Sequence, residues 1–92
     1  MADHRKLDRA WHSVNPLRQH RRLCGLYLRD IGAAVGAGYH TVYRWEKGMS
    51  VPSETQMAAL AEVTQIRNLS KKWQRWLEQQ PVLGKGDHEF TK

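Results

Sequence analysis

The sequence predicts an all-α fold, and three observations indicate that class. Apolar residues recur at spacings of three and four along most of the chain, which is typical of helices with one buried face. Clear helix-start signals precede these segments, and no run of β-branched residues alternates with polar ones as a strand would. With 92 residues, 40% of them hydrophobic, the chain has room for one small domain. We expect a compact bundle of five helices, with an extra N-terminal helix as an option.

The N-terminal extension, residues 1–14, carries apolar positions at i, i+3, i+4 and i+7, namely Leu7, Ala10, Trp11 and Val14. This pattern predicts a short amphipathic helix that packs Trp11 on the core. The alternative is a flexible basic arm that reaches a polyanion. Either form adds positive charge to this end of the chain.

Asn15 followed by Pro16 is a strong helix-start signal, because Asn caps the first turn and Pro suits the first helical position. We therefore expect a helix from Pro16 to about Cys24, with Leu23 and Cys24 on its inner side. His20 and Cys24 lie four residues apart, but two ligands do not complete a zinc site, so we expect no metal and interpret Cys24 as a core thiol.

The stretch 30–48 is predicted to form two short helices joined by a glycine-containing turn. The first helix is expected to bury Ile31, Ala34 and Val35, which follow i, i+3, i+4 spacing. Gly36 suits the left-handed residue that ends a helix.

The second helix of this stretch is expected to run from about Tyr39 to Glu46 and to bury Val42 and Trp45. Its opposite face would carry four polar and aromatic side chains, Tyr39, His40, Tyr43 and Arg44. A pair of helices with such a turn is the geometry in which the second helix enters a DNA major groove.

The second half of the chain is predicted to add two more helices. Ser53 and Gln56 form a capping box, so a helix is expected to begin at Glu54. A last helix is expected from about Leu69 to Gln79. The predicted organisation is an N-terminal extension, one helical domain and a flexible C-terminal tail, at residues 1–14, 15–80 and 81–92.

The charge balance narrows the class of partner. Lys and Arg number 15 against 9 Asp and Glu, which gives a net charge of +6 and favours polyanions such as nucleic acid. Charge alone fits a soluble basic surface equally well. No apolar run is long enough to span a membrane, and the first residues lack a signal-peptide core. Together with the single cysteine, this pattern predicts a cytoplasmic protein.

The run from Leu17 to Ile66 resembles the lambda-repressor-like DNA-binding domain of the phage repressor and Cro type, also called the XRE family. The WEKG string followed four residues later by proline is the most specific part of the resemblance. The matching residues are Leu17, Arg21, Gly25, Leu26, Val35, Gly36, Arg44, Trp45, Glu46, Lys47, Gly48, Pro52, Ser53, Leu60 and Ala61. The resemblance implies a compact five-helix bundle whose second and third helices form a helix-turn-helix.

The resemblance also implies roles for individual residues. It places Tyr39, His40, Tyr43 and Arg44 at base-reading positions. It places phosphate-contacting positions at Lys47 and Ser53. Thr41, on the flank of the helix that carries the base-reading residues, is a further candidate for a phosphate contact. Arg29 would substitute for the polar residue that the family often has at the position of Leu28. The alternatives are that the tyrosines cover core edges and that Arg44 is a solvated surface residue.

Arg21 and Glu46 match family positions that form a buried ion pair between the first helix and the third, so we interpret them as structural. Tyr27 departs from the family pattern, which usually has a Ser or Thr helix cap there. Gly32 replaces a small alanine and would allow closer helix packing at some cost in helix propensity.

The implied function is a sequence-specific regulator of transcription that binds double-stranded DNA, and the resemblance implies a small phage, prophage or bacterial repressor. Such a repressor binds a two-fold operator as a homodimer and excludes RNA polymerase. Trp73, Trp76 and Leu77 are the candidate dimer interface, with a core role as the alternative. The alternative function is an antitoxin that neutralises a toxin and represses its own promoter. Because no Ser/His/Asp set, phosphate loop or metal cluster is present, we expect neither an enzyme nor a cofactor.

Overall fold

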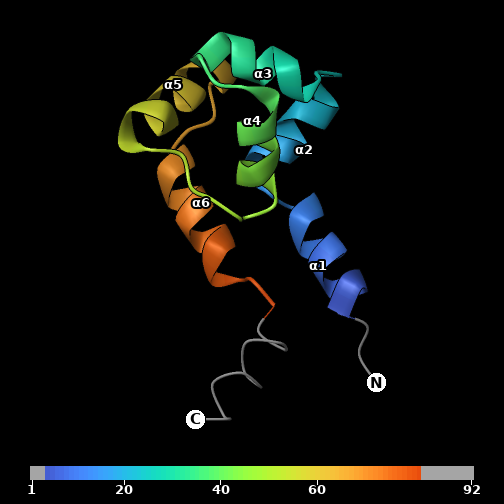
Figure 1. The fold of residues 1–92 in the computed structure, drawn as a ribbon. Coiled ribbons are helices and arrows are strands. Elements are labelled where there is room, and N and C mark those ends of the chain that lie inside the picture. Colours follow the sequence, from blue (N-terminus) through green and yellow to red (C-terminus); the bar gives the residue numbers. More distant parts are fainter. Residues whose placement is uncertain (1–3, 82–92) are drawn as a thin grey trace.

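A computed structural model of the protein describes residues 4–81 (Figure 1). These residues form six helices and no strand, so the predicted all-α class is confirmed for this part of the chain. Apart from the start of the first helix, which was expected at residue 1, the helix ends predicted from the sequence lie within two residues of those observed. The helices are α1 (His4–Ser13), α2 (Pro16–Leu23), α3 (Leu28–Val35), α4 (Tyr39–Glu46), α5 (Glu54–Thr64) and α6 (Leu69–Glu78). The tail predicted for residues 82–92 lies outside the described residues.

Two helix starts depend on side-chain caps that the sequence predicts. The Asn15 Oδ1 atom accepts a hydrogen bond from the backbone N–H of Arg18 at 2.9 Å, which begins α2. At α5, the Ser53 N–H donates to Gln56 Oε1 at 2.8 Å, and the Gln56 N–H donates to Ser53 Oγ at 3.1 Å. Each cap satisfies backbone groups that the first turn of a helix leaves without partners, so these boundaries are fixed locally.

The helices pack as a small bundle with one helix extending from it. In Figure 1, α3 lies across one end of the bundle, and α4 lies at the front of the bundle. α1 projects from α2 at the other end. α3 packs on both α4 and α5, α5 packs on α6, and α6 packs on α2. Within residues 4–81, no helix is long and apolar enough to cross a bilayer.

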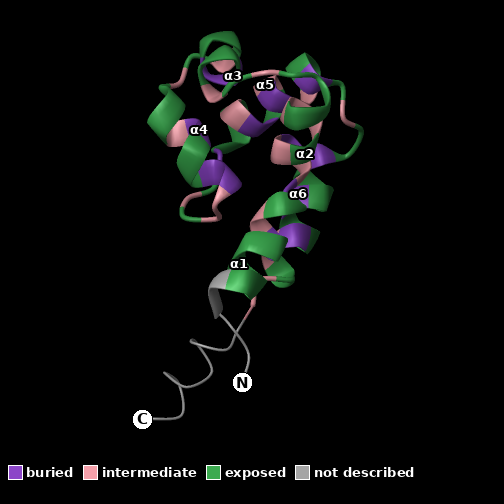
Figure 2. Cartoon of the chain, turned by 90° about the vertical axis from the view of Figure 1, so that its right-hand side faces the viewer, coloured by how far each residue is buried: buried purple, intermediate pink, exposed green. Residues whose placement is uncertain are grey.

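Buried apolar side chains from all six helices form one core. They are Trp11, Leu17, Ile31, Val42, Trp45, Met57, Leu60, Leu69, Trp73 and Trp76. Figure 2 colours the buried positions along the chain. Trp73 is only 1% exposed and Trp76 only 3%, so the prediction that these two tryptophans form a dimer interface is wrong. Leu77 is half-buried and keeps part of its surface in solvent.

Trp76 is buried because α1 covers it. The Trp11 and Trp76 rings stack with centroids 4.1 Å apart and planes 4° from parallel. Each indole N–H donates to the other residue's backbone carbonyl, at 2.7 Å from Trp11 and 2.8 Å from Trp76. The prediction of a helix that packs Trp11 on the core is therefore confirmed, and the flexible-arm alternative is wrong for residues 4–13.

Two residues at the end of α2 that were predicted to face the core are exposed instead. Leu23 is 88% exposed and Cys24 is exposed as well, because the buried side of α2 is set by Leu17 and by Arg21, which turns toward α4. The interpretation of Cys24 as a core thiol is therefore wrong. Its sulfur lies 3.6 Å from His20 Nε2 at the surface.

Candidate nucleic-acid interface

The turn between α3 and α4 depends on two glycines. Gly36 ends α3 with φ of 74°, in the left-handed region that glycine adopts at little cost. The next residue, Ala37, donates its N–H to the Gly32 carbonyl at 2.8 Å. A Cβ on Gly32 would overlap the carbonyl of Ala37, so glycine there lets the turn fold closely onto α3. Gly32 is buried and Ala34 is exposed, which corrects the prediction that Ala34 faces inward.

α4 has one buried and one exposed face. Val42, Trp45 and Glu46 are at most 2% exposed and hold the helix against the rest of the domain. All four of the predicted base-reading residues, Tyr39, His40, Tyr43 and Arg44, are exposed. The tyrosines are about half exposed, at 53% and 45%, so they do not serve as core edges. The helix therefore presents a polar and aromatic surface from a firmly packed support.

The exposed face of α4 carries ring contacts and a cation. The rings of Tyr39 and His40 lie 4.1 Å apart between centroids. Lys47, which caps the C-terminus of α4, places its Nζ atom 5.4 Å from the centroid of the Tyr43 ring. A cation over an aromatic face is attracted by the ring quadrupole. The predicted phosphate contact Lys47 thus lies beside a predicted base-reading residue, while Thr41 is half-buried on the flank of α4.

The start of α3 has a different cap in place of the Ser or Thr that the resemblance would place there. Asp30 Oδ2 accepts a hydrogen bond from the Tyr27 N–H at 2.7 Å. Arg29 is exposed, and its guanidinium lies 5.0 Å above the Tyr27 ring. The carboxylate of Asp30 also suits the positive end of the helix dipole. α3 is therefore anchored, with Arg29 facing solvent at its first turn.

At the start of α5, Ser53 is exposed and its side-chain oxygen accepts the cap hydrogen bond described above. Its hydroxyl hydrogen remains available as a donor, since the cap uses only the oxygen as an acceptor. The first backbone N–H groups of α5 point out of the helix end, as they do at every helix N-terminus.

The ion pair expected between Arg21 and Glu46 is present and bidentate. Arg21 Nε donates to Glu46 Oε2 at 2.8 Å, and Nη2 donates to Oε1 at 3.0 Å. The third nitrogen, Nη1, donates to the Leu26 carbonyl at 3.0 Å. Glu46 is 2% exposed, so its charge depends on Arg21 for compensation. The pair ties α2 and the loop after it to the last turn of α4.

Sequence reasoning missed His12, which meets the end of α4 from α1. Burial lowers the pKa of His12, and the charges of Lys47 and Arg18 lower it further, whereas Asp8 opposes them. The backbone of Lys47 acts in the opposite direction and raises the pKa of His12. No sequence motif signals this contact, because it depends on how α1 docks.

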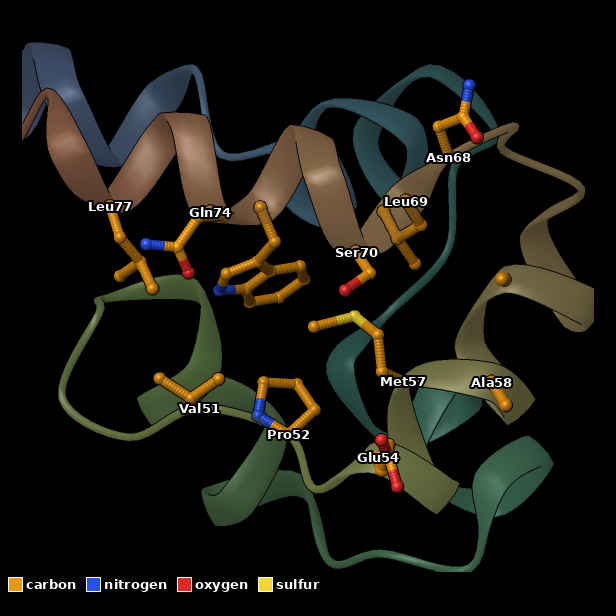
Figure 3. Close-up of a pocket in the computed structure, with 12 residues that line it drawn as sticks. Val51, Pro52, Glu54, Met57, Ala58, Asn68, Leu69, Ser70, Gln74 and Leu77 are labelled. Atoms are coloured by element: carbon orange, nitrogen blue, oxygen red, sulfur yellow. The ribbon is translucent and has the colours of Figure 1, made fainter.

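An apolar groove of about 500 Å³ lies between α5, α6 and the loop that precedes α5 (Figure 3). Its apolar lining includes Val51, Pro52, Met57, Leu69, Trp73 and Leu77. The indole N–H of Trp73 is buried without a hydrogen-bond partner among the described residues. Within residues 4–81, no three His, Cys, Asp or Glu side chains gather as a metal site would require.

Comparisons of this chain with protein-family models, with curated proteins and with solved structures find no match. The geometry of the exposed α4 face therefore carries the functional argument.

Proposed function

We propose that the protein is a sequence-specific DNA-binding regulator of transcription that acts as a small repressor of lambda-repressor-like type. In this proposal α3, the glycine turn and α4 are a helix-turn-helix, and α4 is the recognition helix that enters the major groove. One observation carries the proposal. α4 is fixed by its buried side and directs Tyr39, His40, Tyr43 and Arg44 to solvent.

Base reading would fall to these four side chains. The guanidinium fork of Arg44 matches the O6 and N7 acceptors of guanine, which is the commonest specific contact in the major groove. His40 can donate to a base or a phosphate. The rings of Tyr39 and Tyr43 can contact thymine methyl groups, and their hydroxyls can donate or accept a hydrogen bond.

Phosphate contacts would fix the register of the recognition helix. Lys47 lies at its C-terminal end and Arg29 at the start of α3, while Thr41 lies on its flank and Ser53 at the start of α5. Phosphate contacts position a protein on the duplex, and helix N-termini supply N–H donors for them. The net charge of +6 favours approach to the duplex in the first place.

We further propose that the repressor binds a two-fold operator as a homodimer. Two recognition helices would then read half-sites about 34 Å apart, one helical turn of DNA, and an occupied operator would exclude RNA polymerase. Because Trp73 and Trp76 are buried within one chain, Leu77 is the member of the predicted dimer interface that still has exposed surface. Sedimentation of Leu77→Ser should give a monomer if Leu77 lies in the interface.

A stoichiometric small partner that copurifies in place of a second copy would instead favour the antitoxin hypothesis.

Selection of binding sites from a random duplex library tests the proposed function. Fluorescence anisotropy should then show tighter binding to the selected duplex than to random duplex, with affinity falling steeply as salt rises. Arg44→Ala should weaken binding to the selected duplex by about 1–3 kcal/mol and relax one base position. Arg67→Ala, an exposed change in the loop between α5 and α6, is the matched control and should bind like the wild type. Equal affinity for selected and random duplexes would reject sequence-specific binding.

A further inference from the structure

The end of the proposed recognition helix meets α1 at a close approach. Gly48 follows Lys47 with φ of 72°, and a Cβ at this position would overlap the Trp11 ring. The Trp76 ring lies next to the same point. Gly48 is thus the place where the chain leaving α4 passes directly against the stacked indoles. His12 follows Trp11 on α1, and the charge of Lys47 acts on it.

α1 is held rigidly at this point. The two reciprocal indole hydrogen bonds join Trp11 to Trp76, and both rings are buried. The ring stacking and the buried hydrogen bonds from each indole to the other residue's backbone carbonyl fix both the distance and the rotation of α1. The exposed side of α1 therefore has a set direction relative to α4.

Cationic side chains from three elements gather around His12. Lys47 comes from the end of α4, and Arg18 comes from the first turn of α2; the charges of both act on His12. Arg9 lies three residues before His12 on α1, so the two are neighbours on the helix surface, and Arg9 is exposed. Asp8 is the acid that faces His12.

Among the described residues, none of Arg9, Arg18 and Lys47 forms an ion pair with a carboxylate. The Nε atom of Arg18 is buried without a hydrogen-bond partner there. Lys47 contacts the face of Tyr43. Like charges brought close together repel each other, and an external anion placed between them relieves the repulsion. The arrangement fits a diester phosphate better than it fits a structural ion-pair network.

We propose that Arg9, His12, Arg18 and Lys47 form a second contact with the DNA backbone, which we call the α1 junction. It would hold the phosphates that flank the base pairs read by α4. The proposal rests on the proposed function, because it concerns the same duplex. The path is continuous, since Lys47 contacts the predicted base-reading residue Tyr43 and the next residue, Gly48, lies against Trp11 of α1.

The length of α1 suits this role. Its ten residues span about 15 Å at 1.5 Å per residue. One DNA strand presents a phosphate about every 3.4 Å along the helix axis, so α1 can run past roughly four of them. Base readout belongs to α4 in this arrangement, and the α1 junction adds affinity that does not depend on sequence.

The test compares the full chain with three single variants that each remove one positive charge. Arg9→Gln and Arg18→Gln change the α1 junction, and Arg67→Gln in the loop between α5 and α6 is the matched control on a different part of the bundle. Affinity for a selected and a random duplex is measured over a salt series. Each junction variant should lower affinity for both duplexes by a similar factor. The slope of log affinity against log salt should become shallower by about 0.9 for each phosphate that the variant no longer neutralises. Arg67→Gln should keep the wild-type slope.

The choice of variant and a second measurement distinguish misfolding, failure of the α1 junction and failure of the proposed function. Arg9 is exposed and remote from the core, so Arg9→Gln tests the junction without the risk of misfolding that attends Arg18, whose Nε is buried. Hydroxyl-radical footprinting should show that Arg9→Gln removes protection at the flank of the site while the central protection remains. If both junction variants keep the slope and footprint of Arg67→Gln, the α1 junction does not contact DNA, although the proposed function still stands. If the wild-type chain binds no duplex, the proposed function fails, and this inference fails with it.

Discussion

The outer face of α4 and the Trp11–Trp76 stack use aromatic residues in opposite ways. On α4 the two tyrosines are about half exposed and lie beside His40 and Lys47. In the stack both indoles are buried, and their N–H groups are satisfied by backbone carbonyls. Under the proposed function the exposed aromatics of α4 serve binding, whereas the buried, hydrogen-bonded indoles contribute to stability. Variants of each region should therefore separate the two effects.

Removal of a stacked indole should give the largest effect. Trp11→Ala leaves a cavity beside Trp76 and removes both the ring stacking and the indole hydrogen bond that Trp11 donates, so the free energy of unfolding should fall by about 3–5 kcal/mol. Urea denaturation measures the decrease. Where the variant remains folded, its preference for selected over random duplex should match the wild type. A decrease below about 1 kcal/mol would mean that α1 is not docked as described.

Glu46 holds α4 against the rest of the bundle, because its ion pair joins α2 to the last turn of α4. Glu46→Gln leaves Arg21 facing an uncharged amide, and breaking one partner of a buried pair costs about 3–5 kcal/mol. The matched double variant, Arg21→Met with Glu46→Leu, should recover much of that stability because no uncompensated charge remains. Both are measured by urea denaturation. If the double variant is no more stable than Glu46→Gln, the charge of Arg21 is not the cause.

Substitution of the two glycines near the ends of α4 should have a smaller effect on stability, and the two should differ from each other. Gly48→Ala places a methyl group against Trp11 at a positive φ, and overpacking of this kind costs about 1–3 kcal/mol. Gly38→Ala is the matched control, because φ there is −74° and nothing lies within 4 Å of the added carbon. Thermal and urea unfolding should show destabilisation for Gly48→Ala alone. Equal destabilisation at both glycines would contradict the described approach to the stack.

The smallest effect should be a pH dependence at His12, where the two regions meet. Burial and the charge of Lys47 lower the pKa of His12, so the folded state favours the neutral ring. The unfolded chain takes up the proton near the ordinary value of 6.5, so stability is full above that pH and falls as the pH drops below it. Urea denaturation from about pH 7 to about pH 5 should show a larger decrease for the wild type than for His12→Gln. Identical pH profiles would remove His12 as the source.

Local signals in the sequence predicted the helices well. Asn15 with Pro16, and Ser53 with Gln56, are caps made within one turn, so neighbouring residues alone determine them. Gly36 ends α3 in the left-handed conformation for the same reason. The exposed side of α4 also followed from local spacing, since Val42 and Trp45 leave one direction for the remaining side chains.

Predictions failed where a helix had apolar residues on more than one side. Leu23 and Cys24 are apolar enough to be buried, yet the contact of Arg21 with Glu46 turns them outward. Trp73 and Trp76 exceeded what a five-helix core required, and Trp76 is buried because Trp11 of the extra helix, α1, stacks on it. Periodicity predicts that a helix has a buried face, but the partner that covers it is chosen by the rest of the fold.

The sequence by itself determined the helix boundaries, the glycine turn and the polar face of α4, because each of these depends on interactions within a few residues. Only the tertiary structure decided that Trp11 stacks on Trp76 and that α1 lies against Gly48 at the end of α4. Residues 11 and 76 lie far apart in the chain, and the free energy of their interaction comes from burial and from hydrogen bonds that exist only after docking.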